Sequence, residues 1–366
     1  MSRTVFILTP EPPETGGGME HAVRELIRGL EQRGYTARVF HRGNSLPAWL
    51  AKQRGPFGSK ISETLAGYYI GRNAGKQLTE DVAAVISNSD VGYYSLRREP
   101  ALKKIHFCHG TYRGQSEAIR SFISYGGYLY LKWWSSMVLE RLSGRGKVVV
   151  TCSQQVSDEV SQYFGQKSVP VWLPIDTQRF RPQERAASRE AFGLPAGEPV
   201  GLFVGSTHPM KGFAVMRALI ERLPEVCWVL ALRGNLPGGA RFSPNVTILQ
   251  DVPHDRIPAL YSAADFSVCP SLYEPFGYVV AEALACGTPV IASPGGASRL
   301  FLREEPMGRL LVANPRSAGG FVEAIRAVLC EPEVYRRAVR ERVRPQIEEL
   351  MALENWWRRF FEVTEL

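Results

Sequence analysis

The fold of this chain is decided by the stretch Asp265–Pro294, which reads DFSVCPSLYEPFGYVVAEALACGTPVIASP. Its apolar start, Phe266–Cys269, predicts a short buried strand. A loop follows, and then a helix is expected over Tyr278–Ala285, because the Cys-Gly-Thr-Pro sequence behind it stops a helix. The pair Val290–Ile291 predicts the next strand. Strand, helix and strand in this order indicate a βαβ unit of a parallel sheet.

Short apolar runs alternate with polar or glycine-bearing loops along the rest of the chain as well. Near the start, a glycine-rich turn separates the first strand from a helix that ends before Gly34. Outside the opening stretch we expect strands at Val5–Leu8, Ala37–Phe40, Val82–Ile86, Lys104–Phe107, Val148–Cys152, Val200–Val204, Trp228–Leu232, Val246–Leu249 and Leu310–Val312. This alternation predicts the α/β class, with parallel sheets that carry helices on both faces.

The chain is expected to form two domains. A proline-bearing stretch in mid-chain, Val169–Pro182, interrupts the alternation and predicts a hinge. We therefore expect two doubly wound, Rossmann-like domains, 1–175 and 176–345, that face a cleft, because ligands bind at the carboxyl ends of parallel strands. The last segment, 346–366, is predicted to be a helix that packs back on the N-terminal domain, since it carries the aromatic residues Trp356, Trp357, Phe360 and Phe361.

The composition excludes several classes of protein. With 45% hydrophobic and 22% charged residues, the 366-residue chain can bury cores for two domains, so general disorder is excluded. Its six cysteines form no CxxC pair, which indicates no zinc site and fits a reducing compartment. The N-terminal sequence has no secretion-signal pattern, and no run reaches the roughly 18 apolar residues of a spanning helix. We expect a cytoplasmic protein.

The net charge of +8 arises wholly from the first half of the chain. Residues 1–175 hold 22 Lys and Arg against 14 Asp and Glu, whereas residues 176–366 hold 22 against 22. A basic half beside a neutral one indicates either an anionic partner or charge that serves solubility alone. Nucleic acid is not expected as that partner, because the cations are scattered and the sequence contains no known nucleic-acid-binding module.

Residues 113–147 combine basic side chains with an aromatic centre, Arg120–Arg141 (RSFISYGGYLYLKWWSSMVLER). Aromatic rings at headgroup depth and cations facing anionic lipid are typical of a segment that lies on a membrane. Such a segment would place the protein at the inner face of the plasma membrane. The alternative is a buried helix pair that lines an acceptor site, with Gly126-Gly127 as its turn. Both interpretations stay open at this point.

Two acidic residues lie eight positions apart in the opening stretch. Glu274 falls in the loop and Glu282 on the helix, so the first can face a ligand over the helix N-terminus while the second sits about one turn inside. The backbone amides of Phe276, Gly277 and Tyr278 would point at the same place. Because a helix N-terminus favours anions, the segment predicts a site for a sugar phosphate.

This Glu-x7-Glu pattern, followed by ALACGTPVIA, resembles the signature of retaining GT-B glycosyltransferases of the family 4-like, group 1 type, which use nucleotide sugars. Other matches occur in the family's order along nearly the full chain. They are the glycine loop Gly16–Glu20, the strand end Phe107–Gly110, the hinge Pro174–Asp176 with Phe180–Pro182, the phosphate loop Val204–Gly205 with Lys211–Gly212, and the helix Leu260–Asp265. The resemblance implies an acceptor-side first domain and a nucleotide-sugar-binding second domain.

The resemblance also implies roles for single residues. Glu274 would bond hydroxyls of the donor sugar, and Glu282 the ribose of the nucleotide. Lys211 would neutralise the diphosphate, for which a flexible point charge is suited. Gly17 and Gly18 would let backbone amides approach that diphosphate closely.

The implied reaction is the transfer of a sugar from a nucleotide-diphosphate sugar, with UDP-sugars favoured, to a hydroxyl of a glycan or lipid-linked acceptor, with retention of configuration. The basic first half and the aromatic segment, rather than the resemblance, suggest that it serves the synthesis of surface glycan, lipopolysaccharide or glycolipid. His109 would contact the donor sugar and help stabilise its developing positive charge. We expect no cofactor and no metal, because the sequence shows no acidic pair suited to Mg²⁺.

The sequence departs from the family at Ser206, where many members carry an arginine. Arg233, His208 or Arg299 would have to supply the missing charge. Two other interpretations therefore stay open. One is a catalytically silent GT-B protein that serves as a membrane-associated partner, and the other is a GT-B sugar epimerase or phosphorylase.

Overall fold

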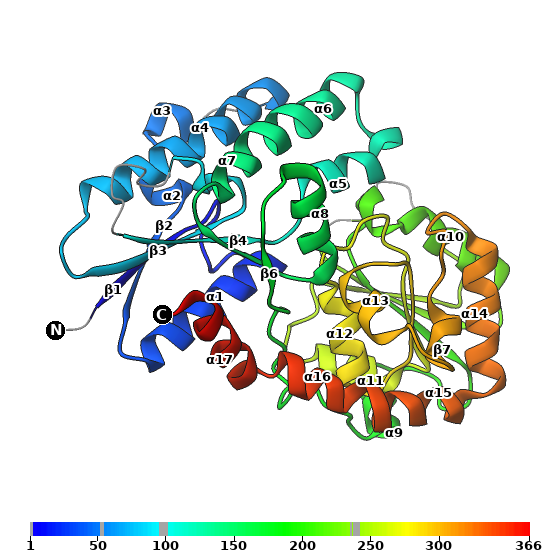
Figure 1. Ribbon diagram of the computed structural model, residues 1–366. Helices are drawn as coiled ribbons and strands as arrows, with labels where there is room; N and C mark the ends of the chain where they lie inside the picture. The colour runs from blue at the N-terminus through cyan, green and yellow to red at the C-terminus, as the bar shows by residue number, and fades with distance from the viewer. Residues whose placement is uncertain (1–2, 52–54, 95–101, 235, 237–241) are drawn as a thin grey trace. The chain divides into compact units, whose positions relative to one another are not determined.

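The computed structural model describes residues 3–51, 55–94, 102–234, 236 and 242–366. The chain divides into two compact units, which Figure 1 shows in colours that run along the sequence. The first unit consists of Met1–Pro174 together with Glu354–Leu366, and the second of Ile175–Leu353. Each is built on one parallel sheet, so the predicted α/β class with two parallel sheets is confirmed.

The sheet of the first unit has its six strands in the order β2-β1-β3-β4-β5-β6. Their bounds are β1 (Thr4–Leu8), β2 (Thr36–Phe40), β3 (Val82–Asn88), β4 (Lys103–Cys108), β5 (Val148–Thr151) and β6 (Val169–Pro170). Strand β6 lies within the stretch that the sequence predicts as a hinge. Its Pro170 is tolerated because β6 is an edge strand, where a missing amide breaks no ladder.

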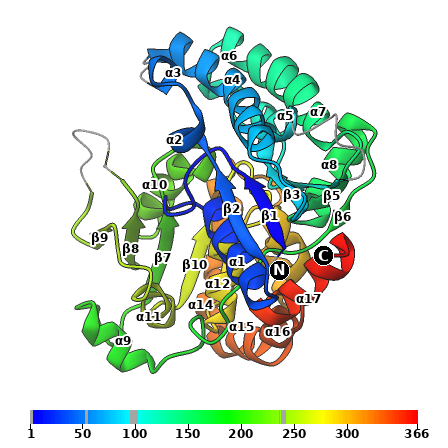
Figure 2. The same ribbon diagram turned by 90° about the vertical axis from the view of Figure 1, so that its left-hand side faces the viewer.

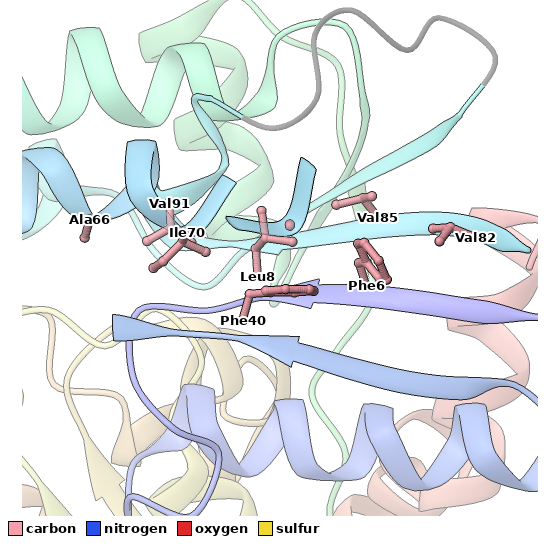
Figure 3. Close-up of a cluster of buried hydrophobic side chains, with 9 residues drawn as sticks. Phe6, Leu8, Phe40, Ala66, Ile70, Val82, Val85 and Val91 are labelled. Atoms are coloured by element: carbon pink, nitrogen blue, oxygen red, sulfur yellow. The ribbon is translucent and has the colours of Figure 1, made fainter. Parts of the chain in front are cut away.

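Helices cover both faces of this sheet (Figure 2). Their bounds are α1 (Gly18–Gln32), α2 (Arg42–Ser45), α3 (Ala48–Ala51), α4 (Gly55–Lys76), η1 (Ser89–Gly92), α5 (Tyr112–Ala118), η2 (Arg120–Phe122), α6 (Tyr125–Leu129), η3 (Tyr130–Glu140), α7 (Arg141–Gly144), α8 (Gln154–Phe164) and α17 (Leu353–Thr364). Figure 3 shows the core on the α4 side, where Phe6 and Leu8 of β1 meet Phe40 of β2 and Ile70 of α4. Burial of these side chains holds α4 against the strands.

The aromatic C-terminal helix α17 packs on the first unit. The Trp357 indole Nε1 donates a hydrogen bond to the Glu25 carbonyl oxygen at 2.8 Å. A Cβ at Gly29 would lie 2.4 Å from the Trp357 ring, so α1 needs glycine at this close approach. Phe360 contacts Phe107 of β4, with ring centroids 5.7 Å apart. The helix thus fills one face of the first sheet.

The expectation of one final helix in 346–366 is wrong in one respect. The chain forms two helices, α16 (Arg344–Met351) in the second unit and α17 in the first, with extended backbone at Ala352 between them. Ala352 breaks the helix because it forms a parallel bridge with Ile175, whose amide also donates to the Met351 carbonyl at 2.7 Å.

The sheet of the second unit has the order β11-β10-β7-β8-β9. Its strands are β7 (Val200–Gly205), β8 (Cys227–Leu232), β9 (Val246–Gln250), β10 (Phe266–Cys269) and β11 (Val290–Ala292). Its helices besides α16 are α9 (Arg185–Ala191), η4 (Pro209–Lys211), α10 (Phe213–Arg222), α11 (Ile257–Ala263), α12 (Tyr278–Ala285), α13 (Gly296–Phe301), η5 (Met307–Leu310), α14 (Ala318–Cys330), α15 (Pro332–Ala338) and η6 (Val339–Val343).

A strand predicted over Leu310–Val312 is wrong. The helical turn η5 takes up Leu310, and the rest of the stretch forms an isolated bridge between Leu311 and Ala292 of β11, in which the Val312 amide donates to the Ala292 carbonyl oxygen at 2.9 Å. The other strands predicted for this unit are confirmed to within two residues at their ends.

Residues Tyr125–Gly144 form one continuous helical run, made of α6, η3 and α7. The Ser124 hydroxyl caps it by accepting a hydrogen bond from the Gly127 amide at 3.1 Å. Gly126-Gly127 therefore lies inside the first helical turn, and the expectation that it forms the turn of a helix pair is wrong. Within the described parts of the chain, no helix combines the length and apolar character required to cross a membrane.

Candidate active site

The loop between β10 and α12 forms the centre of the candidate site in the second unit. Gly277 caps α12 in the left-handed region of backbone conformation, with a φ of +94°. A larger residue would be strained there, so glycine is needed where the loop turns into the helix. Helix α12 begins at Tyr278, four residues after Glu274. The amides of a first helical turn have no acceptor within their own helix. This end of α12 therefore favours an anion.

Lys211 lies against this loop. Its Nζ is 2.7 Å from Oε2 of Glu274, and the Ser271 hydroxyl donates to the same oxygen at 3.0 Å. The backbone next to Lys211 lies close to Pro270 and so positions the lysine. At this approach glycine is needed, because Gly212 has a φ of +71° and a Cβ there would lie 2.0 Å from the Pro270 carbonyl oxygen. The Glu274 carboxylate raises the pKa of Lys211 above its ordinary value, although burial opposes that shift. The site thus holds a charged ammonium group.

Two glycines at the start of α13 hold the same loop from another side. The Gly296 amide donates to the Glu274 carbonyl oxygen at 2.9 Å. A Cβ at Gly295 would lie 2.7 Å from that oxygen, and a Cβ at Gly296 would lie 2.4 Å from the Pro275 carbonyl oxygen. Only glycine lets the two backbones approach so closely.

Glu282 is buried on α12 and has two side-chain neighbours. The Tyr261 hydroxyl donates to its Oε2 at 3.3 Å, and Nε2 of His254 lies 3.7 Å from its Oε1. The Arg179 guanidinium is 2.9 Å from the other ring nitrogen of His254, Nδ1. Because a guanidinium can only donate, Nδ1 accepts and Nε2 carries the proton that faces Glu282. These neighbours orient the Glu282 carboxylate.

Ser206 and Arg233 each follow the carboxyl end of a strand, and the two strands are neighbours in the sheet. Ser206 follows β7, and its hydroxyl oxygen accepts a weak hydrogen bond from the His208 amide at 3.4 Å. Arg233 follows β8, and its backbone amide donates to the Gly205 carbonyl oxygen at 2.9 Å. The side chains of Arg233 and Arg299 are both exposed. Two of the residues considered as a replacement for the missing charge at Ser206 thus lie beside it through their backbones, His208 bonded to Ser206 and Arg233 bonded to Gly205.

Gly17 and Gly18 stand at the N-terminus of α1 in the first unit. Gly17 is the N-cap, and its carbonyl oxygen accepts a hydrogen bond from the His21 amide at 2.9 Å. The carboxylate of Glu20 lies over this glycine, since a Cβ at Gly17 would be 2.0 Å from its Oε2. The helix N-terminus favours an anion and the carboxylate opposes one. Diphosphate contact at these glycines stays a prediction.

His109 follows β4 and is held by a hydrogen-bond chain. The Asn88 side-chain amide donates to the Leu8 carbonyl oxygen at 3.1 Å, which turns its Oδ1 towards Nε2 of His109 at 3.0 Å. Since Oδ1 can only accept, Nε2 carries the ring proton and Nδ1 is an acceptor. Nδ1 is buried and has no hydrogen-bond partner among the described residues. Contact of His109 with a donor sugar stays a prediction.

Burial lowers the pKa of His109 to about 3, and this predicts an acid-sensitive stability term. An unfolded imidazole binds a proton near its ordinary pKa of 6.5, so between the two values the unfolded chain holds more protons than the native one. The stability from the neutral ring is complete above pH 6.5 and is lost as the pH falls towards 3. At about pH 4.5 this effect should have lowered the free energy of unfolding of the wild type by roughly 2–3 kcal/mol, and we expect His109→Gln to lack this decrease.

Urea unfolding of wild type and variant between neutral and acidic pH measures this term. His106, whose pKa burial also lowers, remains in both proteins, and the charge of His109 is a smaller cause of its lowered pKa than burial and Lys147. Parallel stability curves for the two proteins over this range would contradict the prediction.

Of the predicted site residues, the structure joins two in the second unit. The second unit joins Lys211 to Glu274 by direct contact. Sequence reasoning missed the residues that orient the predicted ones, namely Asn88 for His109, Ser271 for Glu274, and Tyr261 and His254 for Glu282. Asn88 and Ser271 stand next to predicted strand ends, where polar residues face ligands in parallel sheets. The sequence around His254 carries no comparable signal.

The chain matches known families and structures over both halves. Residues 16–179 match the model described as Glycosyltransferase Family 4, and residues 184–344 match that described as Glycosyl transferases group 1. D-inositol 3-phosphate glycosyltransferase of Mycobacterium tuberculosis is 34% identical over 165 residues, which are 41% of this chain and 34% of that protein. The chain thus spans about a third of the length of the curated relatives it matches.

Solved structures with nearly complete coverage show the same fold. Sucrose-phosphate synthase from Thermosynechococcus elongatus superposes with a TM-score of 0.77 at 21% identity, over 99% of this chain and 98% of that chain. The Anabaena protein HepE in complex with UDP-glucose superposes with a TM-score of 0.74 at 15% identity, over 99% of both chains. These superpositions show the GT-B fold. The two family models, which together cover nearly the whole chain, show that it belongs to the group 1, family 4-like glycosyltransferases.

Proposed function

We propose that this protein transfers a sugar from a UDP-sugar to an acceptor hydroxyl with retention of configuration. The contact between Lys211 and Glu274 at the N-terminus of α12 carries the proposal. It places a cation and a hydrogen-bonding carboxylate where the helix favours an anion. The HepE structure holds UDP-glucose, which makes UDP-sugars the first donors to test.

Charge development explains why this arrangement suits transfer. Breaking the bond between sugar and phosphate leaves the electron pair, and so negative charge, on the diphosphate. The Lys211 ammonium and the first amides of α12 would stabilise that charge, and they do so most in the transition state. These groups would do without a metal. Glu274 would bind the sugar hydroxyls.

Retention follows if the acceptor attacks from the face that the diphosphate leaves. The acceptor hydroxyl then loses its proton to the departing phosphate, while its oxygen bonds to the anomeric carbon on the same side. Glu274 and Lys211 act on the donor in this scheme, and neither forms a covalent bond to the sugar.

A thermal-shift panel tests the donor site. The purified chain is heated with UDP, GDP, ADP and dTDP and their sugar conjugates, with and without EDTA. A donor that binds the native state raises the midpoint. We expect a UDP-selective rise that EDTA leaves unchanged, followed by UDP release with an acceptor glycan and an axial or equatorial product bond that matches the donor. Absence of any shift would favour the silent-partner interpretation raised by Ser206.

We further propose that the acceptor is a surface glycan or glycolipid precursor, reached at an anionic membrane through residues 113–147. Phe122, Tyr125, Trp133 and Trp134 are exposed in this segment by 44–71% of their surface. The segment carries six Lys and Arg against two Glu. Exposed aromatic rings next to excess positive charge suit the boundary of an anionic bilayer.

Removal of the two most exposed aromatic side chains of this segment should weaken membrane binding. We expect the double variant Tyr125→Ser, Trp133→Ser to bind phosphatidylglycerol vesicles at least about tenfold more weakly, because each ring contributes apolar burial at the interface. Vesicle co-sedimentation measures the effect. Leu350→Ser, which removes an exposed apolar side chain of the second unit, is the matched control. Equal binding of wild type and double variant would refute the membrane proposal.

A further inference from the structure

A second pocket of the second unit lies away from the candidate donor site. It has a volume of about 210 Å³, many times the roughly 10–15 Å³ that one water molecule requires. Its walls include Arg185 of α9, Ser262 of α11, and Arg336 and Arg340 of α15 and η6. Helices α9, α11 and α15 lie together at the lower end of this unit in both views (Figures 1 and 2).

The pocket opens at the other edge of the sheet from the donor site. Its lining residues Ala264 and Thr288 stand just before β10 and β11, at the amino ends of those strands. Lys211 and Glu274 stand beyond the carboxyl ends. The four residues of β10 separate the two edges by about 13 Å. A ligand in this pocket is therefore distinct from the donor.

One carboxylate, Asp265, serves the arginines around the pocket, and its capacity is used up. Its Oδ1 accepts from the Arg185 and Arg336 guanidinium groups, the latter at 2.8 Å. Its Oδ2 accepts from the Arg189 guanidinium at 2.7 Å and from the Val200 amide at 2.8 Å. Four hydrogen bonds fill the lone-pair sites of a carboxylate. The remaining guanidinium hydrogens have to find other acceptors.

Guanidinium donors around the pocket stay without an acceptor. The Nε of Arg185 is buried and has no hydrogen-bond partner in the described part of the chain. Besides Asp265, the ion pairs of the described residues give Arg336 the exposed Glu333 as a partner, at 3.4 Å. Arg340 takes part in none of the ion pairs among the described residues. Several guanidinium donors with one saturated carboxylate form a surplus of positive charge and of unmet donors.

We propose that this arginine pocket binds a phosphate group, either as free phosphate or as the phosphoryl group of a small monoester. Guanidinium groups bind phosphate oxygens with paired, charge-assisted hydrogen bonds. The ligand would neutralise Arg340 and accept guanidinium hydrogens of Arg185 and Arg336 that Asp265 does not accept. Since Cys286 and Gly287 also line the pocket at the C-terminal end of α12, the ligand would contact the helix that carries Glu282.

Calorimetric titration of the full chain with inorganic phosphate and with a hexose monophosphate tests this site. The informative variant is Arg340→Glu, because Arg340 is exposed and holds no ion pair whose loss would unfold the protein. Arg337→Glu makes the same charge change on the same helical run without lining the pocket. We expect Arg340→Glu to weaken binding at least about tenfold and Arg337→Glu to leave it within about twofold.

Two further measurements distinguish binding in this pocket from binding in the donor site. Binding should persist in Lys211→Ala and in the presence of saturating UDP. Tighter binding of the hexose monophosphate would identify an esterified ligand, and equal binding would identify free phosphate. No binding of either probe at millimolar concentration, equal loss with Arg337→Glu, or loss with Lys211→Ala would overturn the proposal.

Discussion

Glu274→Ala is expected to lower kcat for sugar transfer by at least about a hundredfold, the scale seen when one preorganised group of a transition-state site is removed. The Glu274 carboxylate is in contact with Lys211 and accepts a hydrogen bond from Ser271, so it holds the local geometry in addition to its proposed contact with the donor. Its loss also removes the main cause of the raised pKa of Lys211. The cation that would neutralise the diphosphate therefore becomes easier to deprotonate.

Two companion variants make the result specific. Glu274→Gln keeps the size of the side chain and some hydrogen bonding but removes its charge, so it should retain more activity than the alanine variant. Glu304→Ala removes an exposed carboxylate of the same unit and should leave turnover unchanged. Circular dichroism checks that all three proteins are folded. Wild-type turnover in Glu274→Ala would sink the assignment of the donor site.

Gly296→Ala should damage both stability and activity, although it adds one methyl group. The new Cβ would lie 2.4 Å from the Pro275 carbonyl oxygen and 2.6 Å from that of Phe276, so backbone has to move. We expect a loss of about 2–3 kcal/mol in the free energy of unfolding. The shifted loop carries Glu274, and displacement by about 1 Å costs roughly a hundredfold in catalysis.

Gly319→Ala is the control for this substitution. Gly319 lies in α14, and the nearest atom to a Cβ there is the Ser317 hydroxyl oxygen at 3.9 Å. Alanine in an open helical position should stabilise the protein by about 0.4–1 kcal/mol. Urea unfolding and the transfer assay measure both variants. A Gly296→Ala protein that unfolds and turns over like wild type would show that the loop does not depend on this contact.

Much of the fold is encoded in local sequence patterns. The βαβ order around Phe266–Cys269 and Tyr278–Ala285 was predictable, because short apolar runs bounded by glycine and proline depend on near neighbours in the chain. The prediction of a strand over Leu310–Val312 was wrong because it too relied on near neighbours in the chain alone. Its apolar residues suit a strand, but a helical turn at Met307–Leu310 takes up the first of them.

The C-terminal segment shows what only tertiary contacts decide. Its aromatic residues predict packing, yet nothing local marks Ala352 as the place where the helix breaks. The break depends on Ile175, a residue far away in the sequence, whose backbone pairs with it. The same holds for Gly29, which must be small because Trp357 lies over it.

For the candidate site, too, some features follow from the sequence and others only from the tertiary structure. The sequence by itself determined the residue types at Lys211, Glu274 and Glu282 and their positions at strand and helix ends, since that order is a property of the chain. Only the tertiary structure decided that Lys211 pairs with Glu274, that Asn88 sets the tautomer of His109, and that Asp265 is saturated by arginines. Hydrogen bonds and ion pairs between distant segments depend on distances of a few ångströms, which only the packing of sheets and helices sets.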